Sequence, residues 1–374
     1  MLVCKALKYA VFAGPRTWIE GKAVDQLKKS AELPGIEFAA GMPDLHPGRG
    51  LPVGAVWRSS DDPQKIRLYP VLIGNDIGCG MALWKLSTET RTFKPSKFAS
   101  KLTGLDAPPF KSDYQELLKP YEGHPFEKAL GTIGGGNHFA EILTVDTLYR
   151  DGEDLGLEPD CLYLAVHSGS RGFGEDILFR HIRAFGREGL SWESEEAHAY
   201  MALHDEALAF ARTNRRLIAQ RFMKRLRADG LELLDIAHNY ASFENGRLMH
   251  RKGAVSMDHP LAHIPGSRGD FTFVVRPTPE VSNPLALNSL SHGAGRKWMR
   301  SECRGRLEKR YRENDLRKTD LGSVVVCENR DLLYEEAPQA YKSVEDTVTV
   351  LEAEGLCRRV ARLRPLLTYK TMRR

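Results

Sequence analysis

Along this chain, short runs of hydrophobic residues alternate with longer stretches in which hydrophobic positions recur with helical periodicity. Short apolar runs that end in glycine or polar residues are typical of strands, whereas apolar positions three and four apart favour helices. This pattern predicts strands over residues 53–57, 67–73, 81–86, 161–166, 253–257, 271–275, 321–327 and 360–370, the last interrupted by Pro365. It predicts one helix or two over residues 191–227, with Ser191 as N-cap, and helices over 295–312 and 340–354.

The composition is typical of a large globular protein. The chain has 374 residues, of which 42% are hydrophobic and 28% charged, and no apolar run approaches the roughly 20 residues of a membrane span. Residues 1–16 lack the cleavage region of a signal peptide, and six scattered cysteines without a CxxC pair favour reduced thiols in the cytoplasm. Because no linker or repeat divides the chain and its motifs extend from Asp44 to Lys370, we expect one domain over residues 1–374.

Basic residues gather in three stretches although the net charge is only +5. They crowd the predicted helices at 215–227 and 296–312 and the last segment, 358–374. Such clusters suit a polyanion that exchanges its counterions for protein cations. Acidic residues are interspersed, so a solvated helix face is the more ordinary explanation of any one cluster taken alone.

Five residues have the types and surroundings of metal ligands. Asp76 and Cys79 lie three apart in a glycine-rich loop, His138 and His167 adjoin small or amide residues, and His238 precedes an asparagine. A tetrahedral zinc ion needs about four ligands, so five with a shareable thiolate fit two divalent cations. Mixed oxygen, nitrogen and sulfur donors suit Mn²⁺, Co²⁺ or Zn²⁺ better than Mg²⁺ or Ca²⁺. Spacing alone also allows isolated, unliganded histidines, since the chain has 12 of them.

Two further stretches have the character of a phosphate site. His292 lies among small residues that would let a bulky ligand approach its imidazole, and Arg296 follows as a cation. The glycine run at 134–136, followed by Asn137, could hold a phosphate through backbone N–H groups. It is not a P-loop, because no GKS or GKT follows. Taken singly, each stretch also fits an ordinary turn.

In combination these motifs resemble those of RtcB-type RNA ligases, GTP-dependent enzymes that join RNA ends through a 3′-phosphate. The matching stretches occur in family order over nearly the full chain. They are GMPDLHPG from Gly41, NDIGCG from Asn75, GGGNHFAEI from Gly134, VHSGSRGFG from Val166, DIAHNYA from Asp235, HRKGA from His250, HGAGR from His292, EEAPQAYK from Glu335 and PLLTYK from Pro365. The resemblance implies an α+β fold: a single large domain of packed mixed β-sheets flanked by helices, with one deep site between them.

The resemblance also implies an arrangement of the metal ligands. Cys79 would bridge two Mn²⁺ ions, with Co²⁺ or Zn²⁺ as alternatives. One ion would also take His167 and His238, and the other would take Asp76 and His138.

Beside these ions, His292 would attack the α-phosphate of GTP and carry GMP covalently, while Asp44 holds its other ring nitrogen. Glu141 would accept hydrogen bonds from the guanine edge, and Tyr341 would stack on the base. The full set of nucleotide contacts implied is Asn137, Glu141, Ser267, Thr272, Gly293, Arg296, Tyr341 and Lys370. The candidates for the RNA terminal phosphate are Arg171, Lys252 and Arg296.

The implied reaction has three stages. A 2′,3′-cyclic phosphate is hydrolysed to a 3′-phosphate, GMP passes from His292 to that phosphate, and a 5′-hydroxyl attacks the activated end and releases GMP. The expected partners are RNAs with such ends, in RNA repair or tRNA splicing, with no membrane; the sequence identifies no protein activator. After Ser267 the chain has Arg268-Gly269-Asp270 where the family usually has Met-Gly, and its short length fits a compact bacterial repair paralogue.

Two other interpretations stay open. A dinuclear metal-dependent phosphoesterase acting on RNA ends would use the same five ligands, but it gives no role to the pairing of Asp44 with His292 or to Glu141. A non-catalytic RNA-binding protein would need only the basic clusters, and it leaves the retained ligand residues unexplained.

Overall fold

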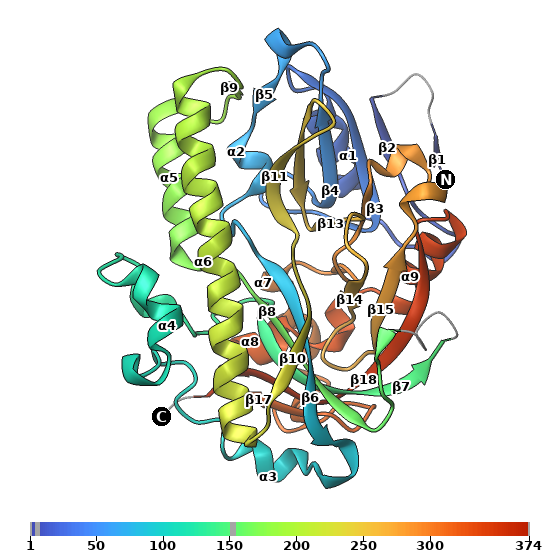
Figure 1. Cartoon of the computed structure of the whole chain (residues 1–374). Coiled ribbons are helices and arrows are strands. Elements are labelled where there is room, and N and C mark those ends of the chain that lie inside the picture. The colour runs from blue at the N-terminus through green and yellow to red at the C-terminus, as the bar shows by residue number, and fades with distance from the viewer. Residues whose placement is uncertain (1, 4–7, 150–154, 373–374) are drawn as a thin grey trace.

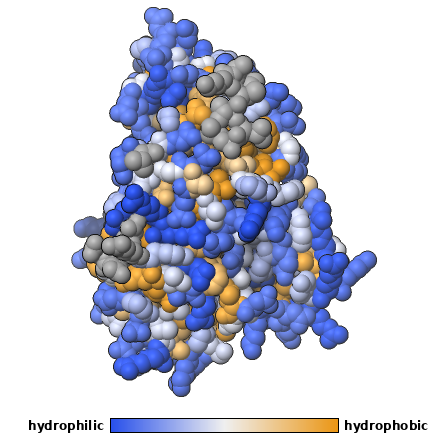
Figure 2. Space-filling view, turned by 90° about the vertical axis from the view of Figure 1, so that its right-hand side faces the viewer, coloured by the Kyte–Doolittle hydropathy of each residue, from blue (hydrophilic) through white to orange (hydrophobic). Residues whose placement is uncertain are grey.

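The computed structural model describes residues 2–3, 8–149 and 155–372. Residues 1, 4–7, 150–154 and 373–374 lie outside the described residues, and they include the end of the C-terminal basic segment. None of the helices in the described part of the chain is both long and apolar enough to cross a membrane. The face drawn in Figure 2 is largely hydrophilic, with smaller hydrophobic patches between the polar side chains.

The larger sheet contains the strands that carry most candidate ligands. Within the described residues its strands follow the order β10-β6-β8-β7-β18-β15-β14, with antiparallel neighbours throughout, and β17 pairs with β18 in parallel. Their bounds are β6 (Gly80–Glu89), β7 (Phe139–Leu148), β8 (Cys161–Ser168), β10 (Gly230–Ala237), β14 (Ala262–Pro265), β15 (Thr272–Pro277), β17 (Val324–Cys327) and β18 (Cys357–Thr371).

A second sheet follows the order β1-β2-β3-β4-β12-β11, and two short pairs, β13 with β16 and β5 with β9, complete the strands of the described residues. Their bounds are β1 (Leu2–Val3), β2 (Tyr9–Val11), β3 (Ile36–His46), β4 (Val53–Ser59), β5 (Arg67–Leu68), β9 (Leu190–Ser191), β11 (Asn239–Glu244), β12 (Arg247–Lys252), β13 (Ala254–Ser256) and β16 (Ser289–Ser291).

Helices flank the sheets, and the two longest run together along one side of the molecule (Figure 1). Ile218 and Phe222 of the longer one, α6, pack in one core cluster with Trp84 and Leu164 of the large sheet. Burial of each such side chain contributes about 1.5–3 kcal/mol, which holds α6 against the strands. The helices are α1 (Gly21–Ala31), α2 (Pro70–Ile73), α3 (Pro95–Ala99), α4 (Gln115–Leu118), α5 (Gly172–Phe185), α6 (Glu195–Leu226), α7 (Arg300–Leu307), α8 (Arg330–Glu335) and α9 (Val344–Ala353).

The α+β class with packed mixed sheets and flanking helices is confirmed. The extent of the domain, residues 1–374, stays a prediction. Three predicted elements are wrong in part. Residues 67–73 form the short β5 and then α2, because Pro70 at the start of α2 fits a helical first turn and has no N–H for a strand ladder. The helix predicted at 295–312 is limited to α7, since Gly295 has a left-handed backbone with φ of 75°.

The third correction concerns the ends and interruptions of long elements. The pattern at 191–227 is one helix that begins after Ser194, whose hydroxyl accepts the N–H of Ala197, while Ser191 belongs to β9. The last strand continues through Pro365 with a register shift. On its other side β15 ends its pairing at Leu363 and β17 begins at Leu367, so no strand on that side needs an N–H from Pro365.

Candidate metal and nucleotide site

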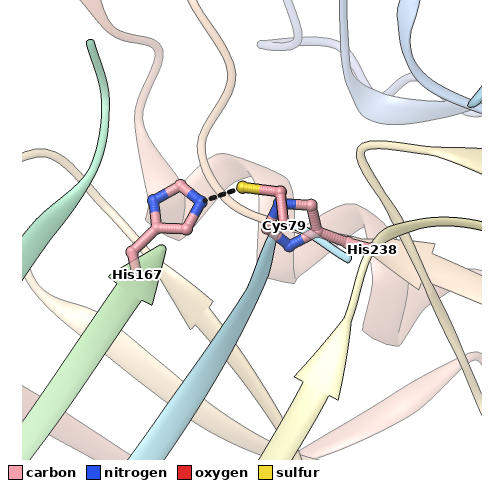
Figure 3. A group of neighbouring side chains, drawn as sticks. All are labelled: Cys79, His167 and His238. Carbon is pink, nitrogen blue, oxygen red and sulfur yellow. Dashed lines mark hydrogen bonds between the residues drawn. The ribbon is translucent and has the colours of Figure 1, made fainter. Parts of the chain in front are cut away.

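Four adjacent strands bring four candidate metal ligands to one edge of the large sheet. Cys79 comes directly before β6, His138 directly before β7, His167 near the end of β8, and His238 directly after β10. Antiparallel neighbours alternate in direction, so two strand starts and two strand ends meet at the same edge. Figure 3 shows Cys79, His167 and His238 converging from three of these strands.

The side chains of these residues form two groups that share Cys79. Its Sγ lies 3.3 Å from Nε2 of His138 and 3.2 Å from Nε2 of His167. Oδ2 of Asp76 lies 2.8 Å from Nε2 of His138. Cys79, His167 and His238 form one group, and Asp76, Cys79 and His138 form the other, each with ligand atoms within 4.8 Å of one another. This is the division between two cations that the resemblance implies.

Hydrogen bonds at the far side of the rings orient two of the imidazoles. Nδ1 of His138 donates to the carbonyl of Ile133 at 3.1 Å, and Nδ1 of His167 donates to that of Asn137 at 3.2 Å. In this tautomer each Nε2 is a lone-pair acceptor facing the Cys79 sulfur, as in metal-bound histidines. Burial, together with the neighbouring histidines, lowers the pKa of His167, so its ring stays neutral.

Several acceptors of this cluster have no protein partner. Among the described residues nothing donates to the buried Asp76 Oδ1, and Nδ1 of His238 is likewise unpartnered. Asp76 Oδ2 and His138 Nε2, both acceptors in the tautomer above, approach to 2.8 Å, which requires a shared proton or a shared cation. The donor set of one carboxylate, one thiolate and three imidazoles therefore fits divalent transition metals.

His292 stands beside the metal cluster and is oriented by a buried carboxylate. Asp44 Oδ2 lies 2.6 Å from its Nδ1 and also accepts its backbone N–H at 3.2 Å. Although burial alone would raise the pKa of Asp44, the charge of His292 lowers it, so the carboxylate stays ionised. A side chain at Gly295 would collide with the Asp44 carbonyl, since its Cβ would lie 2.3 Å from that oxygen. The ring of His292 is 4.8 Å from that of His238, centroid to centroid.

All of these groups except Asp44 border one cavity of about 610 Å³, a size typical of sites for small ligands. Of the predicted nucleotide and phosphate residues, the cavity brings together Asn137, Glu141, Arg171, Lys252, Ser267, Gly293, Arg296, Tyr341 and Lys370. Thr272 is not among its lining residues: it is 2% exposed and pairs with Leu363 inside the sheet. The predicted contact of Thr272 with the nucleotide therefore has no support from the cavity.

At one end of the cavity, buried charges form a connected network. Burial raises the pKa of Glu141 to about 7, against the opposing effects of the Thr368 hydroxyl, which donates to it at 2.5 Å, and of Lys370. Burial would also raise the pKa of Glu336, but Lys370 and the neighbouring arginines lower it to about 2. The Tyr341 hydroxyl donates to Glu336.

The two predicted phosphate cations Arg296 and Lys252 differ sharply. Arg296 uses all three nitrogens within the protein: its Nε, Nη1 and Nη2 donate to Trp298, Glu336, Tyr341, Cys303 and Glu335. Its guanidinium also covers the Tyr341 ring, 4.9 Å from the centroid. The side chain of Lys252 has no hydrogen-bond or ion-pair partner among the described residues, and burial lowers its pKa to about 8. Of the two, Lys252 is the cation that lacks an anion.

Arg171 is held at the cavity by an unusual backbone. Its φ is 60°, although it is not a glycine, and it precedes α5 directly. Its guanidinium covers Gly134, where an added Cβ would lie 2.0 Å from the side chain. Gly134 thus gives room to Arg171, and Nε of Arg171 is buried without a partner among the described residues.

The sequence did not single out several residues that line the cavity. Among them are His46, Asn75, Arg300 and Glu336. His46, Asn75 and Glu336 lie inside stretches quoted for the family resemblance, which was the available signal. Arg300 lies four residues after Arg296 at the start of α7, and only the fold brings it near Glu336, at 3.5 Å.

Part of the basic cluster of α6 is buried or paired with acidic residues. Arg215 and Arg221 are buried, Arg216 pairs with Glu232, and Lys224 pairs with Asp113. The interpretation of this cluster as a polyanion site is therefore wrong for its two buried arginines.

The chain is similar to RtcB ligases along most of its length. The family described as tRNA-splicing ligase RtcB matches residues 26–107 and 115–371. RNA-splicing ligase RtcB2 of Escherichia coli is 48% identical over 98% of this chain and 97% of its own length. The tRNA-splicing ligase RtcB of Archaeoglobus fulgidus is 28% identical over 93% of this chain and 91% of its own length. The RNA-splicing ligase RtcB of Mycobacterium tuberculosis is 29% identical over 91% and 99%, respectively.

Proposed function

Because the chain belongs to the RtcB family of RNA-splicing ligases, we propose that it joins RNA 3′-phosphate or 2′,3′-cyclic phosphate ends to 5′-hydroxyl ends, with GTP as co-substrate. The observation that carries this proposal is the pairing of Asp44 with His292 beside two ligand groups that share Cys79. An imidazole oriented by a carboxylate next to a bound cation is the arrangement that nucleophilic attack on a phosphate needs.

We assign the metal ligands as two sets, Cys79 with His167 and His238, and Cys79 with Asp76 and His138. Two Mn²⁺ ions, or Co²⁺ or Zn²⁺, would polarise phosphate oxygens there and offset negative charge. Neutral imidazoles support this assignment, because a protonated ring cannot ligate.

In the first covalent step, Nε2 of His292 forms a bond to the α-phosphorus of GTP, and the bond to the pyrophosphate leaving group breaks. Asp44 holds the proton on Nδ1 and stabilises the charge that develops on the ring. Glu141 and Lys370 bind the guanine edge. The Tyr341 ring stacks on the base with one face, and Arg296 covers the opposite face of the Tyr341 ring.

The RNA 3′-phosphate, supplied directly or by hydrolysis of the cyclic phosphate, then takes GMP from His292, and the phosphorus–nitrogen bond breaks. The new anhydride makes GMP a good leaving group. A 5′-hydroxyl attacks the 3′-phosphorus, the phosphodiester forms, and GMP leaves. Lys252 and Arg171 would bind the RNA terminal phosphate, since both line the cavity and have unused donors.

The phosphoesterase alternative uses the ligands but not the rest of the cavity. Hydrolysis at two cations needs neither a carboxylate-oriented histidine nor the buried Glu141 in the same cavity. Both are present, which supports transfer over hydrolysis.

Guanylylation of the protein tests the proposal directly. We expect incubation with α-labelled GTP and Mn²⁺ to give an acid-labile label on wild-type protein and on a His198→Ala control, whose residue is exposed on α6. His292→Ala should carry no label and should not join RNA ends. RNA joining by His292→Ala would refute the proposal, and hydrolysis of RNA ends without any label would favour the phosphoesterase.

A further inference from the structure

Two consecutive residues in the middle of α6, Asn214 and Arg215, hydrogen-bond to four chain segments that lie next to candidate metal ligands of the large sheet. Asn214 and Arg215 are 0% and 2% exposed, so neither reaches solvent. Nothing in the proposed reaction requires them to touch substrate, and neither borders the cavity.

Arg215 joins the three strands of the first ligand group. Its Nη1 donates to the carbonyl of Gly78 at 2.7 Å and to that of Ser168 at 2.9 Å. Gly78 directly precedes Cys79, and Ser168 directly follows His167. Its Nε and Nη2 contact Asp235 Oδ1 at 2.8 and 2.6 Å, and Asp235 lies three residues before His238.

Asn214 makes the matching connections to the loop before His138. Its Oδ1 accepts the N–H of Gly131 at 2.8 Å, and its Nδ2 donates to the carbonyl of Thr132 at 3.3 Å. The same Nδ2 lies 3.0 Å from Ser168 Oγ and 3.2 Å from the Gly169 carbonyl. Ser168 Oγ in turn donates to the carbonyl of Ile133, which also accepts from His138 Nδ1.

We propose that Asn214 and Arg215 are positioning residues that set the spacing of the metal ligands. A guanidinium presents donors in a fixed planar fork, so one side chain can fix two carbonyls and a carboxylate at once. The donors are fully buried, and water cannot replace them. The inference rests on the proposed function, because it concerns the same metal site.

The test measures metal binding and ligand geometry rather than ligation. Arg215→Lys keeps the charge opposite Asp235 but loses the planar fork. Partners behind metal ligands typically change metal affinity about 10- to 100-fold. We therefore expect purified Arg215→Lys to bind Mn²⁺ about 10- to 100-fold more weakly and to show a shifted thiolate-to-Co²⁺ absorption band.

Arg216→Lys is the matched control, since Arg216 is the next residue of α6 and pairs with Glu232 of the same strand, β10, at 2.9 Å. It should keep Mn²⁺ affinity within about threefold and leave the Co²⁺ band unchanged, as expected for a half-exposed pair. Asn214→Ala provides a second variant, with the same expected direction, if Arg215→Lys does not fold.

The outcomes distinguish failure of the positioning role from failure of the proposed metal site. Unchanged affinity and an unchanged Co²⁺ band in folded Arg215→Lys, or in Asn214→Ala where the first does not fold, would overturn the positioning role. Equal weakening by the Arg216→Lys control would overturn it too, because the effect would then be general to the helix. If wild-type protein and Cys79→Ser both fail to bind metal, the proposed metal site fails instead.

Discussion

Two groups of residues in the cavity differ in how their polar atoms are paired. We call them the metal end (Asp76, Cys79, His138, His167 and His238) and the base end (Glu141, Glu336, Tyr341 and Lys370). At the metal end, buried acceptors face one another, and Asp76 Oδ1 and His238 Nδ1 have no partner among the described residues. At the base end, Glu336 is contacted by Tyr341, Arg296 and Lys370, and Arg296 has no nitrogen left over.

This difference indicates what each end contributes. Unpaired buried acceptors cost free energy, and bound cations would offset that cost at the metal end. At the base end the carboxylate of Glu336 is already paired with Tyr341, Arg296 and Lys370, so these groups could hold the proposed nucleotide without reorganising, as preorganised sites do. Substitutions at either end can therefore test this difference.

Removal of the shared sulfur should have the largest effect. Cys79→Ser replaces a soft thiolate with a neutral hydroxyl, and both ligand groups lose a member. Substitution of residues that only hydrogen-bond to metal ligands typically lowers metal affinity about 10- to 100-fold. For loss of a shared ligand itself, we expect Mn²⁺ affinity to fall by more than about 100-fold. Guanylylation should disappear in a labelled-GTP assay, whereas metal-free binding of GMP should change little. Equal loss of GMP binding would show that the two ends are not independent.

Lys252 lines the cavity and tests the proposed phosphate site. A hydrogen bond to a charged group contributes about 1.5–3 kcal/mol, so Lys252→Met should lower kcat/KM for RNA 3′-phosphate about 10- to 100-fold. Because burial lowers the pKa of Lys252 to about 8 with no anion nearby, the same variant should raise the melting temperature. Lys252→Arg, which keeps a cation, should restore much of the activity. A substitution that leaves RNA kinetics unaltered would remove Lys252 from the site.

The base end should respond to pH through Glu141. Its pKa is raised by burial to about 7, so the carboxylate becomes protonated as the pH falls below that value. A protonated group cannot accept both guanine hydrogens, so GMP affinity should fall by up to about tenfold per pH unit below 7. Calorimetry without metal would measure this, and Glu141→Gln should bind more weakly with no such slope. A slope that persists in Glu141→Gln would assign the titration to another group.

Much of the fold could be predicted where one local rule dominated. The apolar runs at 81–86 and 161–166 became β6 and β8, because buried strands leave that pattern. Residues 67–73 and 295–312 could not be predicted, because a proline and a left-handed glycine override hydrophobic periodicity over a few residues.

Site residues could be predicted where they belong to short sequence motifs, and could not be predicted where their contacts depend on the fold. Cys79, His138 and His292 stand in distinctive short motifs, so the resemblance selected residues that border one cavity, while their roles stay a prediction. Arg215 stood in a run of arginines whose only visible property was charge, and burial against Asp235 depends on strand pairing that no local pattern encodes. Arg296 was assigned to phosphate because sequence cannot reveal that its donors are already used.

The smallest expected effect separates the ring of Tyr341 from its hydroxyl. The hydroxyl belongs to the satisfied network, between Glu336 and Arg296, while the ring face covered by Arg296 leaves its other face for a base. Tyr341→Phe should therefore change GMP affinity less than about threefold and cost about 1 kcal/mol of stability in urea unfolding. Tyr341→Ala should weaken GMP binding about 10- to 100-fold, because stacking on an aromatic ring is worth about 1–3 kcal/mol per base. If Tyr341→Phe weakened binding as much as Tyr341→Ala, the hydroxyl would contact the nucleotide, and the base end would have to reorganise on binding as the metal end does.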